Sequence, residues 1–127
     1  MTRRHWHAYA YTGRSYPDSA IRRGEAPSDY PPIEIKDWLR RPAAQVVVTC
    51  TGVEEAVGWV EGELTQNPPV DQEHFPVWDR LQYVRETLLL TAGGDVVLGY
   101  YSKARQYVSR ALVACPRGEG DGCPYGE

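Results

Sequence analysis

Long apolar runs and a leader-like segment are both missing from this sequence of 127 residues. Its longest apolar run, at 111–115, holds five residues, far short of the ~20 that a membrane-spanning helix needs. The first seven residues, Met1-Thr2-Arg3-Arg4-His5-Trp6-His7, carry charge, but no apolar stretch follows them, so we expect no secretory signal. We therefore predict a cytoplasmic protein that does not enter a membrane.

Several catalytic signatures are absent as well. No glycine-rich loop follows a predicted strand in the register that binds phosphate, and the chain has neither a Gly-x-Ser-x-Gly elbow nor a His-Glu-x-x-His pair. The formal net charge is only −3, which gives no overall basic surface for a polyanion. These absences disfavour nucleotide hydrolysis, serine-type acyl transfer and non-specific binding to nucleic acid or anionic lipid.

What is present is typical of one globular domain. Hydrophobic residues make up 42% and charged residues 24% of the chain, which is ordinary usage for a packed core. Alternation and β-branched content predict strands at 5–11, 45–50, 96–101 and 106–115, with 45–50 as a buried central strand. Helical spacing predicts helices at 53–64 and 77–88, the first preceded by Thr51-Gly52-Val53-Glu54, the pattern of a capping box.

This order of elements predicts an α+β fold, a two-layer sandwich. We expect one four- to five-stranded, mostly antiparallel sheet with two helices packed on one face. Residues 1–116 would form this single domain, with a long surface loop at 13–32, and residues 117–127 a flexible tail containing glycine and cysteine. Two segments stay ambiguous: 33–41 fits a short strand running into a helical turn, and 104–114 also keeps helical spacing.

The predicted hairpin at 96–115 is rich in tyrosine and basic residues. Between Val96 and Gly118 the chain has four Lys or Arg residues and no carboxylate. Tyrosine and arginine stack on bases, contact phosphates and are frequent in protein interfaces. Our first interpretation is a non-enzymatic interaction protein that binds another protein or a nucleic acid, and homo-oligomerisation is also open. The alternative is that the basic residues only keep the hairpin tip hydrated. The expected binding residues are Tyr100, Tyr101, Lys103, Arg105, Tyr107 and Arg110.

A pair of histidines supports a second interpretation. His5 and His7 would share one face of a strand, because side chains two residues apart point the same way, so both could reach one metal ion. Their spacing resembles the His-hydrophobic-His motif of rolling-circle replication initiators, relaxases and small single-tyrosine transposases, and Tyr100-Tyr101-Ser102-Lys103 is similar to the Tyr-x-x-Lys motif of the initiators. The resemblance covers these two short motifs. It implies a DNA-nicking nuclease in which the histidines bind Mg²⁺ or Mn²⁺, Tyr100 attacks the DNA phosphate and Lys103 assists.

The alternative without a function for the histidine pair is an edge strand whose half-exposed face carries both rings. In that case neither imidazole has a catalytic role, and the sequence identifies no catalytic residue.

The cysteines support a third interpretation. Thiols of a cytosolic chain are free, redox-active or metal-bound more often than they are disulfide-bonded. Seven residues separate Cys115 from Cys123, whereas paired zinc ligands are usually separated by about two to four. A zinc-stabilised binding module that combines these two with Cys50 or with the histidines would need the tail to fold back. The alternative is a buried, unligated Cys50 and two mobile thiols.

Overall fold

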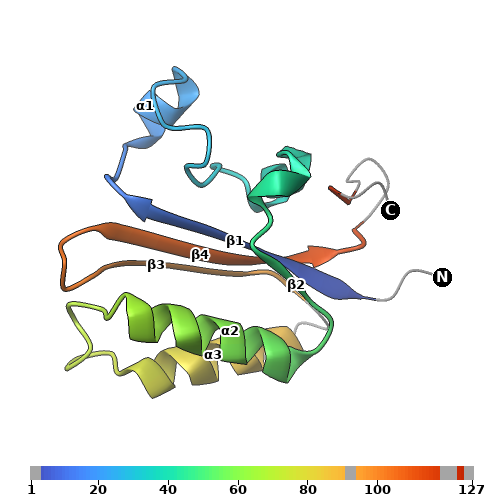
Figure 1. Cartoon of the computed structure of the whole chain (residues 1–127), viewed down its shortest axis with the longest axis vertical. Helices are drawn as coiled ribbons and strands as arrows, with labels where there is room; N and C mark the ends of the chain where they lie inside the picture. The colour runs from blue at the N-terminus through green and yellow to red at the C-terminus, as the bar shows by residue number, and fades with distance from the viewer. Residues whose placement is uncertain (1–3, 91–93, 118–122, 125–127) are drawn as a thin grey trace.

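The computed structural model describes residues 4–90, 94–117 and 123–124. Strands β1 (His5–Gly13), β2 (Val48–Cys50), β3 (Val96–Tyr101) and β4 (Tyr107–Cys115) form one antiparallel sheet in the order β2-β1-β4-β3. Helices α2 (Val53–Gln66) and α3 (Val77–Leu90) cover one face, which we call the helix-covered face (Figure 1). The α+β prediction is thereby confirmed.

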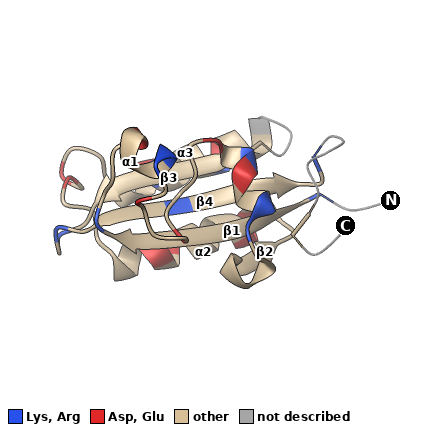
Figure 2. Cartoon of the chain, turned by 90° about the horizontal axis from the view of Figure 1, so that it is seen from above, with Lys and Arg blue, Asp and Glu red and all other residues tan. Residues whose placement is uncertain are grey.

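The segment between β1 and β2 lies over the opposite, loop-covered face (Figure 1). It contains the short helix α1 (Asp18–Arg22) and two 3-10 turns, η1 (Ile35–Arg40) and η2 (Ala43–Gln45). The stretch at 13–32 therefore includes a helical turn, and the ambiguous 33–41 stretch forms a 3-10 turn instead of a strand. Figure 2 looks onto this face and shows β1 and β4 running beneath the covering segment.

The two central strands are β1 and β4, which pair along their whole length from His5↔Cys115 to Gly13↔Tyr107. The prediction of a central strand at 45–50 is wrong: β2 has three residues and lies at the sheet edge. Its β-branched composition indicated burial, yet Val47 lies outside the strand and is 54% exposed. β-Branched residues favour any pleated surface and do not by themselves distinguish an edge from a centre.

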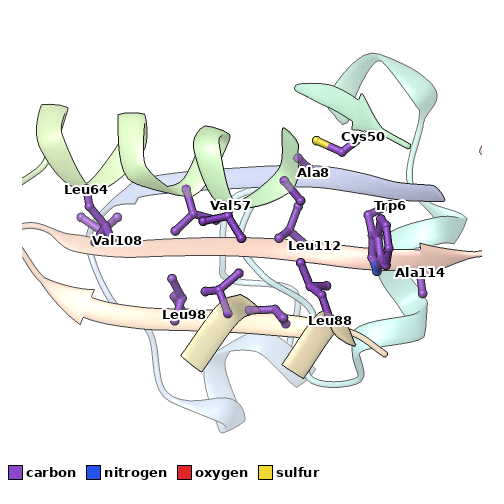
Figure 3. Close-up of a cluster of buried hydrophobic side chains, with 14 of the residues drawn as sticks. Trp6, Ala8, Cys50, Val57, Leu64, Leu88, Leu98, Val108, Leu112 and Ala114 are labelled. Atoms are coloured by element: carbon purple, nitrogen blue, oxygen red, sulfur yellow. The ribbon is translucent and has the colours of Figure 1, made fainter. Parts of the chain in front are cut away.

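Apolar side chains from the sheet and the two helices form the main core on the helix-covered face (Figure 3). Alternation along β1 and β4 sends every second residue to this face, and the helical spacing of α2 and α3 presents a matching stripe. The buried members labelled in Figure 3 are Trp6, Ala8, Cys50, Val57, Leu64, Leu88, Leu98, Val108, Leu112 and Ala114.

The start of α2 is capped differently from the expected capping box. Gly52 is the N-cap residue and makes no side-chain cap bond. The backbone N–H of Thr51 donates to Glu55 Oε1 at 2.8 Å, so the carboxylate that reaches back belongs to Glu55. Glu54 points elsewhere and accepts from Arg85 Nε of α3, also at 2.8 Å. The helix boundary was predicted correctly, but the capping partner was not.

The hairpin of β3 and β4 is confirmed, since the two strands pair from Val96↔Leu112 to Tyr101↔Tyr107, and the helical alternative for 104–114 is wrong. Of the predicted tail, only Arg117, Cys123 and Pro124 lie among the described residues, as the remainder falls outside them. Across the described part of the chain, no helix combines the length and the apolarity needed to cross a membrane.

Candidate metal centre

The centre is built on the N-terminal half of β1. Strand alternation places His5 and His7 on the loop-covered face, while Trp6 between them enters the main core. Because β1 is an interior strand, both imidazoles are buried, with 7% and 1% of their surface exposed. The alternative in which both rings lie on the half-exposed face of an edge strand is therefore wrong.

Two cysteines complete the group. Cys115 ends β4 directly opposite His5 in the register of the two strands, and Cys123 returns to the same place from beyond β4, with 7% of its surface exposed. One ligand atom from each of the four residues lies within 4.8 Å of the other three, and all four residues are buried. The fold therefore brings these four residues together as a candidate His₂Cys₂ metal-binding group.

The ligand atoms lie near the spacing that a four-coordinate zinc ion requires. Cys123 Sγ lies 3.1 Å from His7 Nε2 and 4.0 Å from His5 Nε2. The two imidazole centroids are 4.7 Å apart and the rings are nearly perpendicular, at 76°. Zinc bonds of about 2.0–2.3 Å in a tetrahedron put ligand atoms roughly 3.3–3.8 Å apart. Shifts of about 1 Å would bring all four atoms to those distances.

Thr49 of β2 orients one of the imidazoles. Its Oγ1 lies 2.9 Å from Nδ1 of His7. If Nδ1–H donates to this hydroxyl, the lone pair of Nε2 points toward Cys123. Metal-ligating histidines almost always use their second ring nitrogen in this way, which fixes the tautomer and the ring plane. No local sequence pattern singles out Thr49, because its role depends on the pairing of β1 with β2.

Cys50 is not part of the group. It follows Thr49 on β2, so its side chain points to the other face and enters the main core, fully buried. Burial, with a smaller contribution from the nearby Glu55 carboxylate, raises the pKa of its thiol to about 11. A protonated thiol is a poor metal ligand. Of the candidate ligands considered from the sequence, the structure thus brings together His5, His7, Cys115 and Cys123 and leaves Cys50 apart.

The Tyr-x-x-Lys residues are not brought to the histidines. Tyr100 belongs to the helix-covered face, where its hydroxyl donates to the backbone oxygen of Asn67 at 2.8 Å and its ring lies 5.3 Å from the Arg80 guanidinium carbon. Burial is the main cause that raises the pKa of this phenol. Lys103 is exposed in the β3–β4 turn. The sheet therefore stands between Tyr100 and the histidine pair.

The six residues expected to bind a partner do not share one surface either. Tyr100 and Arg110 are buried on the helix-covered face, and Arg110 Nε donates to Glu63 Oε1 at 2.7 Å. The exposed members are Tyr101, Lys103 and Arg105. Tyr107 is partly buried and lies beside Tyr101, with ring centroids 5.8 Å apart. Only the Tyr101 and Tyr107 rings remain together on the loop-covered face.

Comparison with known proteins adds no family assignment. No protein-family model matches this chain, and neither a curated protein nor a solved structure matches it. The candidate metal centre is therefore the feature from which a function has to be argued.

Proposed function

We propose that this chain is a zinc-stabilised binding module in which His5, His7, Cys115 and Cys123 hold one Zn²⁺ ion. The observation that carries the proposal is the convergence of four buried ligand atoms within 4.8 Å of one another. Two imidazoles and two thiolates are a common ligand set of structural zinc sites. Mg²⁺ and Mn²⁺ prefer oxygen ligands, so this donor set does not suit them.

The number of ligands argues for a structural role of the metal. A catalytic zinc keeps one coordination position for water or substrate, whereas a structural zinc takes all four ligands from the protein. Here four protein ligands are available, and none of the four residues is more than 7% exposed. The proposed ion completes the fold and leaves no position for a substrate, so we place the chain among binding modules rather than among enzymes.

The position of the ligands explains what the ion would stabilise. His5 and Cys115 lie at the same end of the two central strands, and Cys123 is 116 residues from His7 in the sequence. An ion at this point would fasten the chain beyond β4 to β1. Metal binding to such a site contributes directly to the free energy of folding, since the unfolded chain has no preformed site.

The test is the metal content of protein prepared without a histidine tag. Elemental analysis should find stoichiometric zinc in the natural protein, and Cys115→Ser and Cys123→Ser should each lose it. Replacement of zinc by Co²⁺ should give the intense visible absorption of a tetrahedral site with thiolate ligands. Circular dichroism of each variant separates loss of the metal from loss of the fold.

Matched controls exist within the chain. Cys50→Ala removes a cysteine outside the group, and His74→Ala removes an exposed histidine, so both variants should retain zinc. Protein without zinc, protein with another metal such as iron, or retention of zinc by folded Cys115→Ser and Cys123→Ser would each overturn the proposal.

A further inference from the structure

The loop-covered face also has a cavity, at the end of the sheet away from the metal centre. This cavity of about 630 Å³ is lined by residues of α1, of the segments before and after it, and of the β3–β4 hairpin. This volume lies in the usual range of small-ligand pockets. The aromatic residues that line the cavity are Tyr16, Tyr30, Tyr101 and Tyr107.

The four rings form one connected wall. Tyr16 meets Tyr30 edge to face, with centroids 5.2 Å apart. Tyr30 lies 6.2 Å from Tyr107, and Tyr107 lies 5.8 Å from Tyr101. The Tyr101 hydroxyl then donates to Ser15 Oγ at 3.1 Å, next to Tyr16 in the chain, so the contacts close into a circuit.

Most of the phenolic hydroxyls in this wall are used within the protein. The Tyr30 hydroxyl accepts from the backbone N–H of Tyr16 at 2.9 Å, and the Tyr101 hydroxyl is bonded to Ser15. Tyr107 hydrogen-bonds Ser109, although burial is the larger influence on its phenol and raises its pKa. A ligand would therefore meet tyrosine rings, whose faces are electronegative, together with proline and isoleucine side chains.

The charge of the cavity has the same sign as the ring faces. Among the described residues that line it, Asp18 is the only charged one, and its exposed carboxylate has no ion-pair partner in the described part of the chain. The Arg14 guanidinium carbon lies 5.3 Å from the centroid of Tyr16, so this ring already contacts a cation and a cationic ligand would depend on the other three rings. Tyrosine faces together with a carboxylate favour a cationic ligand.

We propose that this cavity binds a trialkylammonium group, carried by a free small molecule or by a methylated lysine side chain. An unalkylated ammonium has three N–H donors to satisfy, and the Asp18 carboxylate is the one charged acceptor among the described residues that line the cavity. An alkylated ammonium has no such donors and is attracted to ring faces through its charge alone. The inference gives the binding module a ligand class, but it does not depend on the zinc site, which lies at the other end of the sheet.

The first measurement is a titration of the natural protein with choline, followed by NMR of the tyrosine ring signals. Its neutral carbon analogue, 3,3-dimethylbutan-1-ol, has the same shape without the charge. Choline should shift the ring signals with a Kd of about 1 mM, and the neutral analogue should bind about tenfold or more weakly. A peptide with trimethyllysine, compared with its unmethylated form, identifies the source: tighter binding than choline assigns the site to a lysine side chain, and weaker binding assigns it to a small molecule.

Variants locate the site. Tyr101→Leu keeps apolar bulk at an exposed position but removes the ring, and Asp18→Asn removes the charge; each should weaken choline binding by about fivefold. Tyr83→Leu changes an exposed tyrosine on α3, outside the cavity, and should leave binding unchanged. Equal binding of choline and its neutral analogue, or absence of binding by both cations at about 10 mM, would overturn the proposal. Zinc content measured on the same samples keeps this result separate from the proposed function.

Discussion

The two faces of the sheet are covered in different ways. The helix-covered face is lined mainly by aliphatic residues, and two helices of fourteen residues each pack on it. The loop-covered face carries histidine, cysteine and tyrosine, and its smaller cluster centres on Tyr9 stacked on Trp38 at 4.5 Å. Buried apolar area stabilises the first face, whereas the second depends on specific contacts. Both candidate sites belong to the face with the smaller apolar core.

Removal of the proposed metal should give the largest effect and should separate the two faces most sharply. With zinc present at about 1,000 times its Kd, binding contributes about 4 kcal/mol to the free energy of unfolding. A chelator should therefore lower the Tm by roughly 10–20 °C, and added zinc should restore it. Hydrogen exchange should accelerate at the His5 and Cys115 ends of β1 and β4, while α2 and α3 stay protected. A Tm that does not respond to chelator would contradict this expectation.

Truncation of the main core should be the next largest effect. Leu112 on β4 is 1% exposed and packs among the core residues of the helix-covered face. Leu112→Ala should lower the free energy of unfolding by about 2–5 kcal/mol, by the same amount with and without chelator. Val97→Ala, at a 40% exposed position on the other face of β3, should cost under about 1 kcal/mol. Denaturant unfolding of the three proteins measures both values.

The cysteine of the helix-covered face should affect stability only in alkali. Burial raises the pKa of Cys50 from 9.0 to about 11, so between these pH values the unfolded chain has released a proton that the folded chain retains. The free energy of unfolding should fall as pH rises from 9 to 11, with Cys50 contributing at most about 2–3 kcal/mol to the fall.

The comparison that isolates this effect is the slope of stability against pH for natural protein and for Cys50→Ala. The variant should have the shallower slope. Tyr11, Tyr100 and Tyr107, whose pKa values burial also raises, contribute equally to both slopes. Identical slopes would mean that Cys50 is not held protonated by its surroundings.

The smallest effect should come from the residue that orients a ligand without touching the metal. Thr49→Val removes the hydroxyl that lies 2.9 Å from His7 Nδ1 and keeps the side-chain volume. Zinc affinity should fall about tenfold, measured by competition with a chromogenic chelator, while zinc stoichiometry stays unchanged. Thr51→Val, at an exposed position beyond the same strand, is the matched control, and equal affinity in both variants would argue against the proposed role of Thr49.

Local patterns of the sequence predicted much of the helix-covered face. The apolar spacing of α2 and α3 and the alternation of the β3–β4 hairpin depend on neighbours a few residues apart, and these elements formed where they were expected. The covering of the opposite face was harder to predict. The 3-10 turn at Ile35–Arg40 has neither helical nor strand periodicity of useful length, and its role depends on Trp38 reaching Tyr9.

The sequence alone determined that His5 and His7 would share one face of a strand, because that follows from backbone geometry. It also supplied cysteines as candidate ligands, with three to choose from. Tertiary structure decided the choice: the pairing of β1 with β4 placed Cys115 opposite His5, and the return of the chain brought Cys123 to His7 across 116 residues. The pairing of β1 with β2 on its other side made β1 an interior strand and turned Cys50 to the other face. Such contacts join opposite ends of the chain, so no local pattern encodes them, and only the completed sheet brings the four ligands together.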